Sequence, residues 1–223
     1  MNGASPLTIL YQDEWLIAVD KPAGQLVHPA DIPQEDDQVT MKILRDQIGT
    51  QVRAIHRLDR PTTGVLLFST NRTTTRALSR AFERHQVQKV YHAIIDGHPS
   101  SDQWRCEEPL RKSEDAPEKE AATDFQILKK FQNKLALVEA LPRSGRYHQI
   151  RRHLLHGGTP IVGDYRYTGF ERCEELAAKH GLGTRMFLQS KSLTFTHPSS
   201  KEEMTITAPE DPLFERLALA CLD

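Results

Sequence analysis

At 223 residues the chain is long enough to bury a sizeable core, in one large domain or in two lobes. Its hydrophobic fraction of 38% and charged fraction of 26% are ordinary for a globular protein, so they select no functional class. The net charge of -1 argues against a protein that is basic throughout, as many nucleic-acid-binding proteins are. Basic residues nevertheless gather at 53–60, 72–89 and 143–153, so one face of the protein could bind a polyanion.

The cysteines and the apolar runs predict the cellular compartment. Cys106, Cys173 and Cys221 are far apart and odd in number, so neither a metal-binding spacing nor a disulfide framework is indicated. Residues 1–6 lack the basic and apolar regions of a secretory signal, and the longest apolar runs are too short to cross a bilayer. The sequence therefore favours a reduced, soluble, cytoplasmic protein with no membrane partner.

The first third of the chain alternates strand and helix patterns. Short apolar runs at 7–11 and 15–19 are separated by three polar residues, which predicts a β-hairpin. Residues 39–48 have apolar side chains at helical spacing, and Gly49 directly after them predicts the end of a helix. The continuous apolar run at 65–69 is typical of a buried strand.

The helix expected after Asn71 has two different faces. Asn71 can cap it, and the pattern predicts that it continues to about His85. Its apolar side chains are expected to face inward: Ala77, Leu78, Ala81 and Phe82. Every fourth residue is an arginine: Arg72, Arg76, Arg80 and Arg84. This arginine ridge either binds a polyanion or is simply a solvated helix face, and the sequence leaves both interpretations open.

The remaining elements complete the fold class. Residues 89–96 alternate as a strand does, whereas residues 98–120 are polar and contain three prolines, which predicts an excursion outside the core. Further strands are expected at 123–128, 135–141, 187–195 and 204–207, the first two joined through Gln132 and Asn133, and helices at 146–156, at 171–180 and at the C-terminus. This mixture predicts an α+β fold with a mixed, largely antiparallel sheet and flanking helices.

The stretch His56–Gly64, HRLDRPTTG, sets Asp59 between two arginines just before the buried strand. Guanidinium groups on both sides favour an ionised carboxylate that is presented to an anionic ligand. The alternative is that an aspartate before Pro-Thr-Thr-Gly only forms a turn.

Arg151 is a cation at a position that is expected to be buried, since it falls within an apolar stripe of the helix expected at 146–156. At about 100° per residue, one side of this helix carries Tyr147, Ile150, Leu154 and Leu155, and the opposite side carries Arg152, His153 and His156. A buried arginine needs an anion, and a carboxylate fits it best; alternatively, Arg151 reaches the helix edge or joins an ordinary salt bridge. A pair between Asp59 and Arg151 in a central catalytic cleft would account for both motifs.

A single carboxylate narrows the chemistry. Glycosidic hydrolysis normally uses two carboxylates, and no second acid stands in a comparable setting. A serine-type site that uses His56, or a metal site built from His28, His56 and Asp59, lacks a supporting spacing. An aspartate that acts as nucleophile or base among arginines and a tyrosine indicates chemistry on a nucleotide whose phosphates the arginines hold.

HRLDRPTTG also resembles the HRLDxxTSG motif of the RluA-type pseudouridine synthases. Four further blocks resemble the same family in matching order: LIAVDKPAGQLVHP, QKVYHAIIDG, SGRYHQIRRHLLHGGTPIVGD and LQSKSLTFTHPSSKEEMTITAP. The resemblance implies the pseudouridine synthase fold and the isomerisation of a specific uridine to pseudouridine in RNA by base flipping, since the glycosidic bond is unreachable in a stacked helix.

Matching positions carry the implied roles of the site residues. Asp59 would be the catalytic residue, Arg57 the side chain that enters the RNA stack, and Tyr91 the aromatic ring that stacks on the flipped uracil. Tyr91 has an alternative as an ordinary core aromatic of an alternating strand.

The same resemblance implies that Arg151 pairs with Asp59, and that Arg146 and His148 support the cleft or contact phosphate. Two positions depart from the family pattern: Thr63 replaces a serine and Ser144 a threonine. Both keep a hydroxyl, so the hydrogen bonds of these turns are expected to survive.

The resemblance also implies the substrate and the domain organisation. It is closest to the branch that modifies a T-stem-region uridine of tRNA, so tRNA is preferred over ribosomal RNA as the partner. Ribosomal RNA, or a catalytically idle RNA-binding protein of the same fold, are the alternatives. We expect one catalytic domain over residues 1–223, no N-terminal S4-type domain, no cofactor, no metal and no obligate protein partner.

Overall fold

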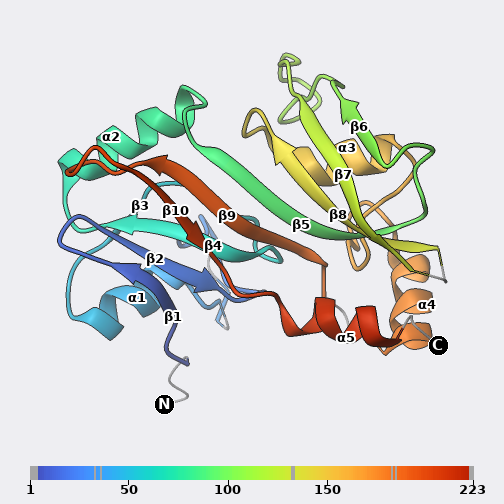
Figure 1. Cartoon of the computed structure of the whole chain (residues 1–223). Helices are drawn as coiled ribbons and strands as arrows, with labels where there is room; N and C mark the ends of the chain where they lie inside the picture. Colours follow the sequence, from blue (N-terminus) through green and yellow to red (C-terminus); the bar gives the residue numbers. More distant parts are fainter. Residues whose placement is uncertain are drawn as a thin grey trace. The chain divides into compact units, whose positions relative to one another are not determined.

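The computed structural model describes residues 5–220 except 33, 36, 132, 133, 182 and 184, without the side chains at 180 and 217–220. The chain forms two compact units, Met1–Gln88 with Ser190–Pro209 (unit 1) and Lys89–Gln189 with Glu210–Asp223 (unit 2). Each unit combines strands with helices (Figure 1), which confirms the predicted α+β class.

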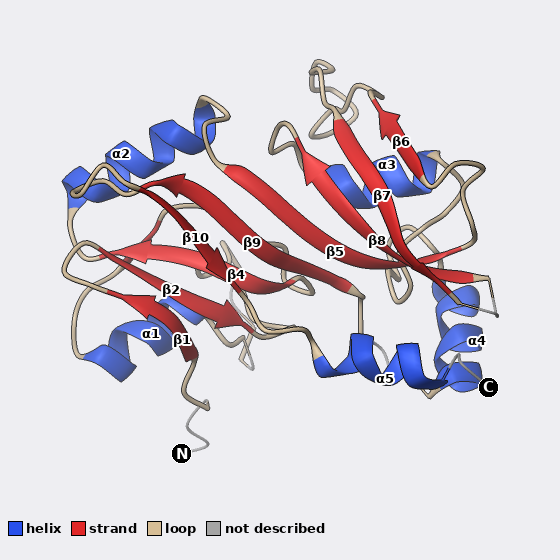
Figure 2. Cartoon of the chain, viewed as in Figure 1, coloured by secondary structure: helices blue, strands red, loops and turns tan. Residues whose placement is uncertain are grey.

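Unit 1 is built on a largely antiparallel sheet. Its strands are β1 (Thr8–Gln12), β2 (Leu16–Lys21), β3 (Arg53–Ala54), β4 (Thr63–Ser69), β10 (Glu203–Thr207) and nearly all of β9 (Leu188–Thr196). Its helices are α1 (Thr40–Ile48) and α2 (Arg72–Glu83), which lie beside these strands in Figure 2. The strand order is β1-β2-β4-β9, with β3 also paired to β4 and β10 to β9. The expected hairpin of β1 and β2 is antiparallel.

Short-range hydrogen bonds explain where these elements begin and end. Asp13 Oδ1 accepts the N–H of Leu16 at 2.8 Å, which closes the turn between β1 and β2. Gly49 ends α1 in the left-handed conformation, with φ 69°. Asn71 Oδ1 accepts the N–H of Thr74 at 2.8 Å, as predicted for the cap of α2.

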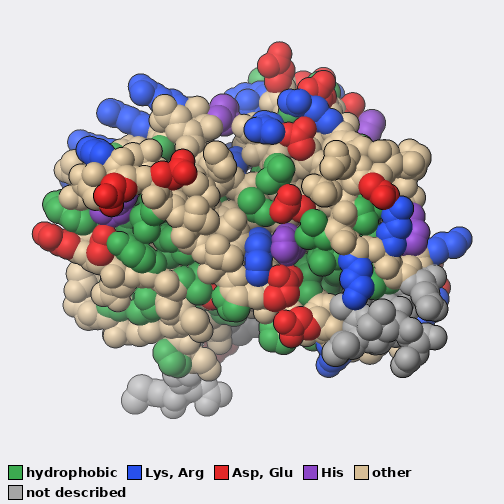
Figure 3. Space-filling view, viewed as in Figure 1, with side chains coloured by type: hydrophobic (Ala, Val, Ile, Leu, Met, Phe, Trp, Pro, Cys, Tyr) green, Lys and Arg blue, Asp and Glu red, His purple; other side chains and the backbone are tan. Residues whose placement is uncertain are grey.

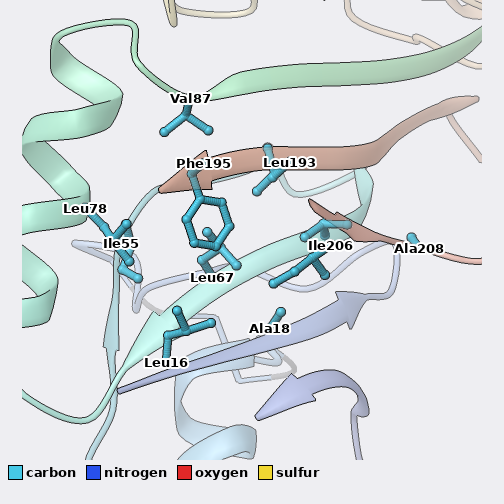
Figure 4. Close-up of a cluster of buried hydrophobic side chains, with 11 residues drawn as sticks. Leu16, Ala18, Ile55, Leu67, Leu78, Val87, Leu193, Phe195, Ile206 and Ala208 are labelled. Atoms are coloured by element: carbon cyan, nitrogen blue, oxygen red, sulfur yellow. The ribbon is translucent and has the colours of Figure 1, made fainter. Parts of the chain in front are cut away.

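The core of unit 1 lies between α2 and the sheet. Every residue of β4 is buried, as its continuous apolar run predicts. Figure 4 shows Leu67 of β4, Leu78 of α2 and Phe195 of β9 in this cluster. The prediction that Ala77 faces inward is wrong, because the buried face of α2 is centred on Thr74 and Leu78, and Ala77 is exposed.

Unit 2 contains a second antiparallel set of strands. Its strands are nearly all of β5 (Gln88–Asp96), β6 (Gln103–Cys106), β7 (Thr123–Lys130) and β8 (Leu135–Pro142), and its helices are α3 (Gln149–His156), α4 (Phe170–His180) and α5 (Pro212–Ala220). The order is β5-β8-β7-β6, and each neighbouring pair is antiparallel. The predicted turn residues Gln132 and Asn133 lie outside the described residues.

The polar excursion is more ordered than predicted. Residues 98–120 contain β6, which pairs with β7, and the Trp104 ring stacks on Phe125 at a centroid distance of 5.0 Å. A strand of four residues with two polar members is too short to be recognised by periodicity, so only the neighbouring β7 reveals it. In the described part of the chain, no helix has the length and apolar character that crossing a bilayer requires.

Candidate active site

Asp59 lies in unit 1 on the turn that leads into β4. The N–H of Thr62 donates to the carbonyl of Asp59 at 3.0 Å, so the turn predicted from Pro-Thr-Thr-Gly is present. Leu58 is buried and Asp59 is partly buried, which anchors the turn on one side and leaves the carboxylate partly accessible. Turn formation and presentation of the carboxylate are therefore compatible at this position.

A buried lysine that sequence reasoning did not select holds this turn. Lys21 is 0% exposed, and its Nζ donates to the carbonyls of Pro22, Arg60 and Thr62 at 2.9, 3.0 and 2.9 Å. A buried ammonium group is costly unless it is hydrogen-bonded, so these three acceptors fix the backbone on both sides of Pro61. The only sequence signal is the Lys-Pro pair within DKPAG, which marks a turn but says nothing of burial.

The two arginines that flank Asp59 have different environments. The Arg60 guanidinium pairs with Asp37 at 3.0 Å and donates to the carbonyl of Gly24 at 2.9 Å, so Arg60 ties the turn to a neighbouring loop. Arg57 is exposed and forms no ion pair with any residue that the structure describes. Partial desolvation, and secondly the charge of Arg57, lower the pKa of His28. Of the two, Arg57 alone is available to an external anion.

His56 and Gly64 belong to the scaffold around Asp59. His56 Nε2 accepts the N–H of Leu67 at 3.1 Å and the ring stacks on Phe82 at 4.6 Å, which favours a packing role over the serine-type and metal alternatives. Gly64 has φ 98°, and a Cβ there would lie 2.1 Å from the carbonyl oxygen of Ser190. Only glycine therefore lets β4 begin so close to the backbone of β9.

Tyr91 lies in unit 2 on β5, opposite Ala140 of β8. It is partly buried and packs against the apolar cluster of this unit, so the ring is held by the core but not enclosed by it. Two residues earlier on the same face, Lys89 Nζ donates to the carbonyl of Ser144 at 2.7 Å. Burial lowers the pKa of Lys89 to about 8.

The turn before α3 is organised by Gln149. Its Oε1 accepts from the Ser144 hydroxyl at 2.6 Å and from the N–H of Arg146 at 3.0 Å, so the hydroxyl at position 144 keeps a turn hydrogen bond as expected. His148 has the left-handed φ of 53°, which no regular helix contains. The helix therefore begins at Gln149, whereas the sequence predicted that it begins at Arg146.

Arg151 is buried, and its carboxylate partner in unit 2 is one that the sequence analysis did not name. Arg151 and Asp164 are 5% and 2% exposed, and Nε and Nη2 donate to the two carboxylate oxygens at 2.7 and 2.8 Å. The guanidinium also lies over the Tyr167 ring, 5.0 Å from its centroid. The need for an anion is thus met by Asp164, whereas Asp59 belongs to unit 1 and its pairing with Arg151 stays a prediction.

The helical-wheel prediction for α3 is partly wrong. Of its apolar stripe, Ile150 and Leu154 are buried, whereas Tyr147 and Leu155 are exposed. His153, predicted on the opposite side, is fully buried because its ring nitrogens bond to the Thr123 hydroxyl at 2.9 Å and to the Glu108 carbonyl at 3.0 Å. Burial lowers the pKa of His153, as expected for an enclosed neutral imidazole.

Comparisons with known proteins identify the family. Residues 15–156 match the family model described as RNA pseudouridylate synthase. The chain belongs to this family. A protein of Haemophilus influenzae named tRNA pseudouridine synthase C is 39% identical, over 95% of this chain and 96% of the relative. Its namesakes in Pasteurella multocida and Vibrio parahaemolyticus are 40% and 35% identical, over 92% and 95% of this chain and 92% and 93% of their own lengths.

Solved structures support the fold of this pseudouridine synthase. Human RNA Pseudouridylate Synthase Domain Containing 4 superposes with a TM-score of 0.78 at 24% identity, over 96% of this chain and 93% of that chain. Human RNA Pseudouridylate Synthase Domain Containing 1 gives a TM-score of 0.77 at 24% identity, over 99% and 90%. These structures confirm the predicted fold, and the family model and the relatives confirm the predicted family and enzyme class.

His148, another predicted site residue of the synthase, belongs to an aromatic and cationic group in unit 2. His148 Nδ1 lies 2.9 Å from the Tyr167 hydroxyl, and its ring stacks on Tyr147 at 3.7 Å. Arg166, exposed and missed by the sequence analysis, lies 5.9 Å from the centroids of the Tyr147 and Tyr167 rings. Arg146 Nε donates to the carbonyl of Glu120 at 3.1 Å, which fits a supporting role. Unit 2 thus offers rings for stacking beside guanidinium groups.

Proposed function

We propose that this protein converts one uridine in the T-stem region of tRNA to pseudouridine. The N1–C1′ bond breaks, the uracil turns, and a C5–C1′ bond forms while C5 loses a proton and N1 gains one. Nothing is hydrolysed or oxidised. The observation that carries the proposal is the full-length similarity, at 35% to 40% identity, to three proteins named tRNA pseudouridine synthase C. A cytoplasmic location belongs to the same proposal.

Asp59 is the proposed catalytic carboxylate, acting as nucleophile or base. The support is its position on a turn that Lys21 anchors through three carbonyls, since a reacting group must be held firmly to be effective. Arg57 is proposed to enter the RNA stack that the target base leaves. Its exposure and the absence of an ion pair to any described residue support this role.

Tyr91 is proposed to stack on the flipped uracil. A ring packed on the core along one part and accessible along another is suited to this task, because stacking needs a rigid platform. Arg151, aligned by Asp164 and the Tyr167 ring, is proposed to hold the catalytic carboxylate in its ionised form. Arg146 and His148 are proposed to support this arrangement or to contact phosphate.

The deciding experiment is tritium release from tRNA labelled at uracil C5. Wild type should release tritium stoichiometrically with one uridine, whereas Asp59→Asn and Asp59→Ala should release none while still binding tRNA. Sequencing of pseudouridine in total cellular RNA treated with the protein identifies the modified position. Modification of ribosomal RNA alone would refute the proposal that tRNA is the substrate. RNA binding without tritium release from any RNA would refute the proposed activity and indicate an RNA-binding protein.

The role of Arg151 has its own test. Arg151→Met should abolish tritium release while leaving RNA affinity largely intact. Loss of an arginine that only binds phosphate would instead mainly weaken RNA affinity. Arg166→Met is the matched control in unit 2, because this exposed arginine lies near the same rings but forms no ion pair with a residue that the structure describes. A fully active Arg151→Met variant would contradict the proposed role.

A further inference from the structure

The arginine ridge of α2 stands apart from the other charged surfaces of unit 1. Arg72, Arg76, Arg80 and Arg84 are all exposed. No side chain of the ridge forms an ion pair or a hydrogen bond with a residue that the structure describes. Figure 3 shows blue side chains gathered over α2 at the upper left of the molecule. The ridge is therefore a row of cations that the folded chain does not neutralise.

Apart from Arg57, the other arginines of unit 1 have partners within this unit. Arg45 pairs with Asp46 at 2.7 Å and Arg60 with Asp37 at 3.0 Å, while Arg53 donates to the carbonyl of Thr70 at 3.4 Å. On α2 itself the only acidic residue is Glu83, and it takes part in no ion pair with the described residues.

The spacing of the ridge does not serve the helix. Like charges four residues apart lie one above another on a helix and repel each other, and the ridge contains three such pairs. Arg72 stands at the first helical position, where the helix dipole disfavours a cation. Only Arg80 and Arg84, near the other end, are favoured by the dipole. The Asn71 cap and the buried face around Leu78 hold the helix in spite of this pattern.

The length and chemistry of the ridge match a polyanion with evenly spaced charges. Twelve residues of α-helix extend for about 18 Å, a length that covers several nucleotides of an RNA strand. Guanidinium groups bind phosphate oxygens with two parallel hydrogen bonds, so each arginine can hold a phosphate without reading a base.

We propose that the arginine ridge binds the phosphate backbone of the RNA substrate. This inference rests on the proposed function, since it assumes an RNA substrate. The ridge supplies affinity and not the choice of uridine, because phosphate contacts carry no sequence information. It also accounts for RNA binding by a protein whose net charge is only -1, since the cations are concentrated on one helix.

The test is Arg76→Gln combined with Arg80→Gln, measured by binding of an unmodified tRNA transcript at several potassium chloride concentrations. Losing two phosphate contacts should weaken binding by about tenfold at moderate salt and reduce the slope of log K against log salt by about 1.5. Tritium release at saturating tRNA should stay unchanged, because neither residue belongs to the proposed catalytic group. Glutamine keeps much of the side-chain length and the helix propensity, so the variant should fold.

The matched control is Lys42→Gln combined with Arg45→Gln on α1, which removes the same charge from another helix of unit 1. Its tRNA affinity should be close to that of wild type. Equal losses in the two double variants would overturn the proposal in favour of unspecific attraction. Unchanged binding in the ridge variant would also overturn the proposal. The ridge would then be a solvated helix face or a binding site for an acidic protein. If wild type releases no tritium from any RNA, the proposed function fails instead, so the two failures are distinguishable.

Discussion

The two units hold a buried cation beside a proposed catalytic element in different ways. In unit 1 the Lys21 ammonium is satisfied by three backbone carbonyls and thereby fixes the turn of Asp59. In unit 2 the Arg151 guanidinium is satisfied by the carboxylate of Asp164 and by an aromatic face. The first arrangement uses one charge to order neutral backbone, and the second aligns a charge with another charge. The difference predicts how each unit responds when a partner is removed.

Removal of the carboxylate in unit 2 should have the largest effect on stability. Asp164→Ala leaves the Arg151 guanidinium buried without its carboxylate partner in this unit, which should lower the free energy of unfolding by about 3–5 kcal/mol. Urea denaturation followed by circular dichroism measures the change. Arg151→Met combined with Asp164→Leu should recover part of the stability but no tritium release. A loss below about 1 kcal/mol for Asp164→Ala would mean that the pair is only a surface-type salt bridge.

A glycine of equivalent geometry lies in each unit, and both should be intolerant of a side chain. A Cβ at Gly64 would lie 2.1 Å from the Ser190 carbonyl oxygen, and one at Gly163, next to Asp164, would lie 2.0 Å from that of Arg185. Because backbone must move, Gly64→Ala and Gly163→Ala should each cost about 3 kcal/mol. Gly49→Ala, which meets no atom within 4 Å at φ 69°, is the control and should cost about 1 kcal/mol. Equal losses at all three sites would show that only the positive φ matters.

Removal of the Lys21 ammonium group in unit 1 should destabilise the protein less than removal of the Asp164 carboxylate. Lys21→Met deletes a buried charge together with its donor and leaves three carbonyls without that donor, which should cost about 2 kcal/mol. Tritium release should fall at saturating tRNA, because the Asp59 turn is no longer held. Lys42→Met on the surface is the control, and full activity of Lys21→Met would show that the turn orders itself.

A further expected effect is a pH dependence of stability that belongs to unit 2. Burial lowers the pKa of Lys89 from 10.5 to about 8, so the unfolded chain binds more protons than the folded one between these values. Stability should therefore rise with pH across the window from about 8 to 10.5, by up to about 1.4 kcal/mol per unit. The urea midpoint of wild type minus that of Lys89→Met, measured from pH 7.5 upwards, should show this rise. A difference that is flat with pH would mean that Lys89 titrates normally.

Short-range patterns in the sequence were sufficient to predict most of the elements. The hairpin of β1 and β2, the Asn71 cap and the Gly49 stop depend on residues close together in the chain, and the apolar run that predicted β4 is contiguous. The HRLD turn and the family blocks were recognisable for the same reason, since they are contiguous in the chain. Asp59 could thus be selected before any tertiary contact was known.

Tertiary structure alone decided which charged and polar side chains are buried and what satisfies them. Lys21 meets carbonyls about forty residues away, Arg151 meets a carboxylate on the loop after its helix, and His153 meets Thr123. In the sequence Lys21 and His153 look like ordinary surface residues, and the apolar stripe around Arg151 indicates burial but not its partner. A buried charge is tolerated only when other segments supply its partners, and the tertiary fold brings those segments together, so no local pattern can reveal which residues the partners are.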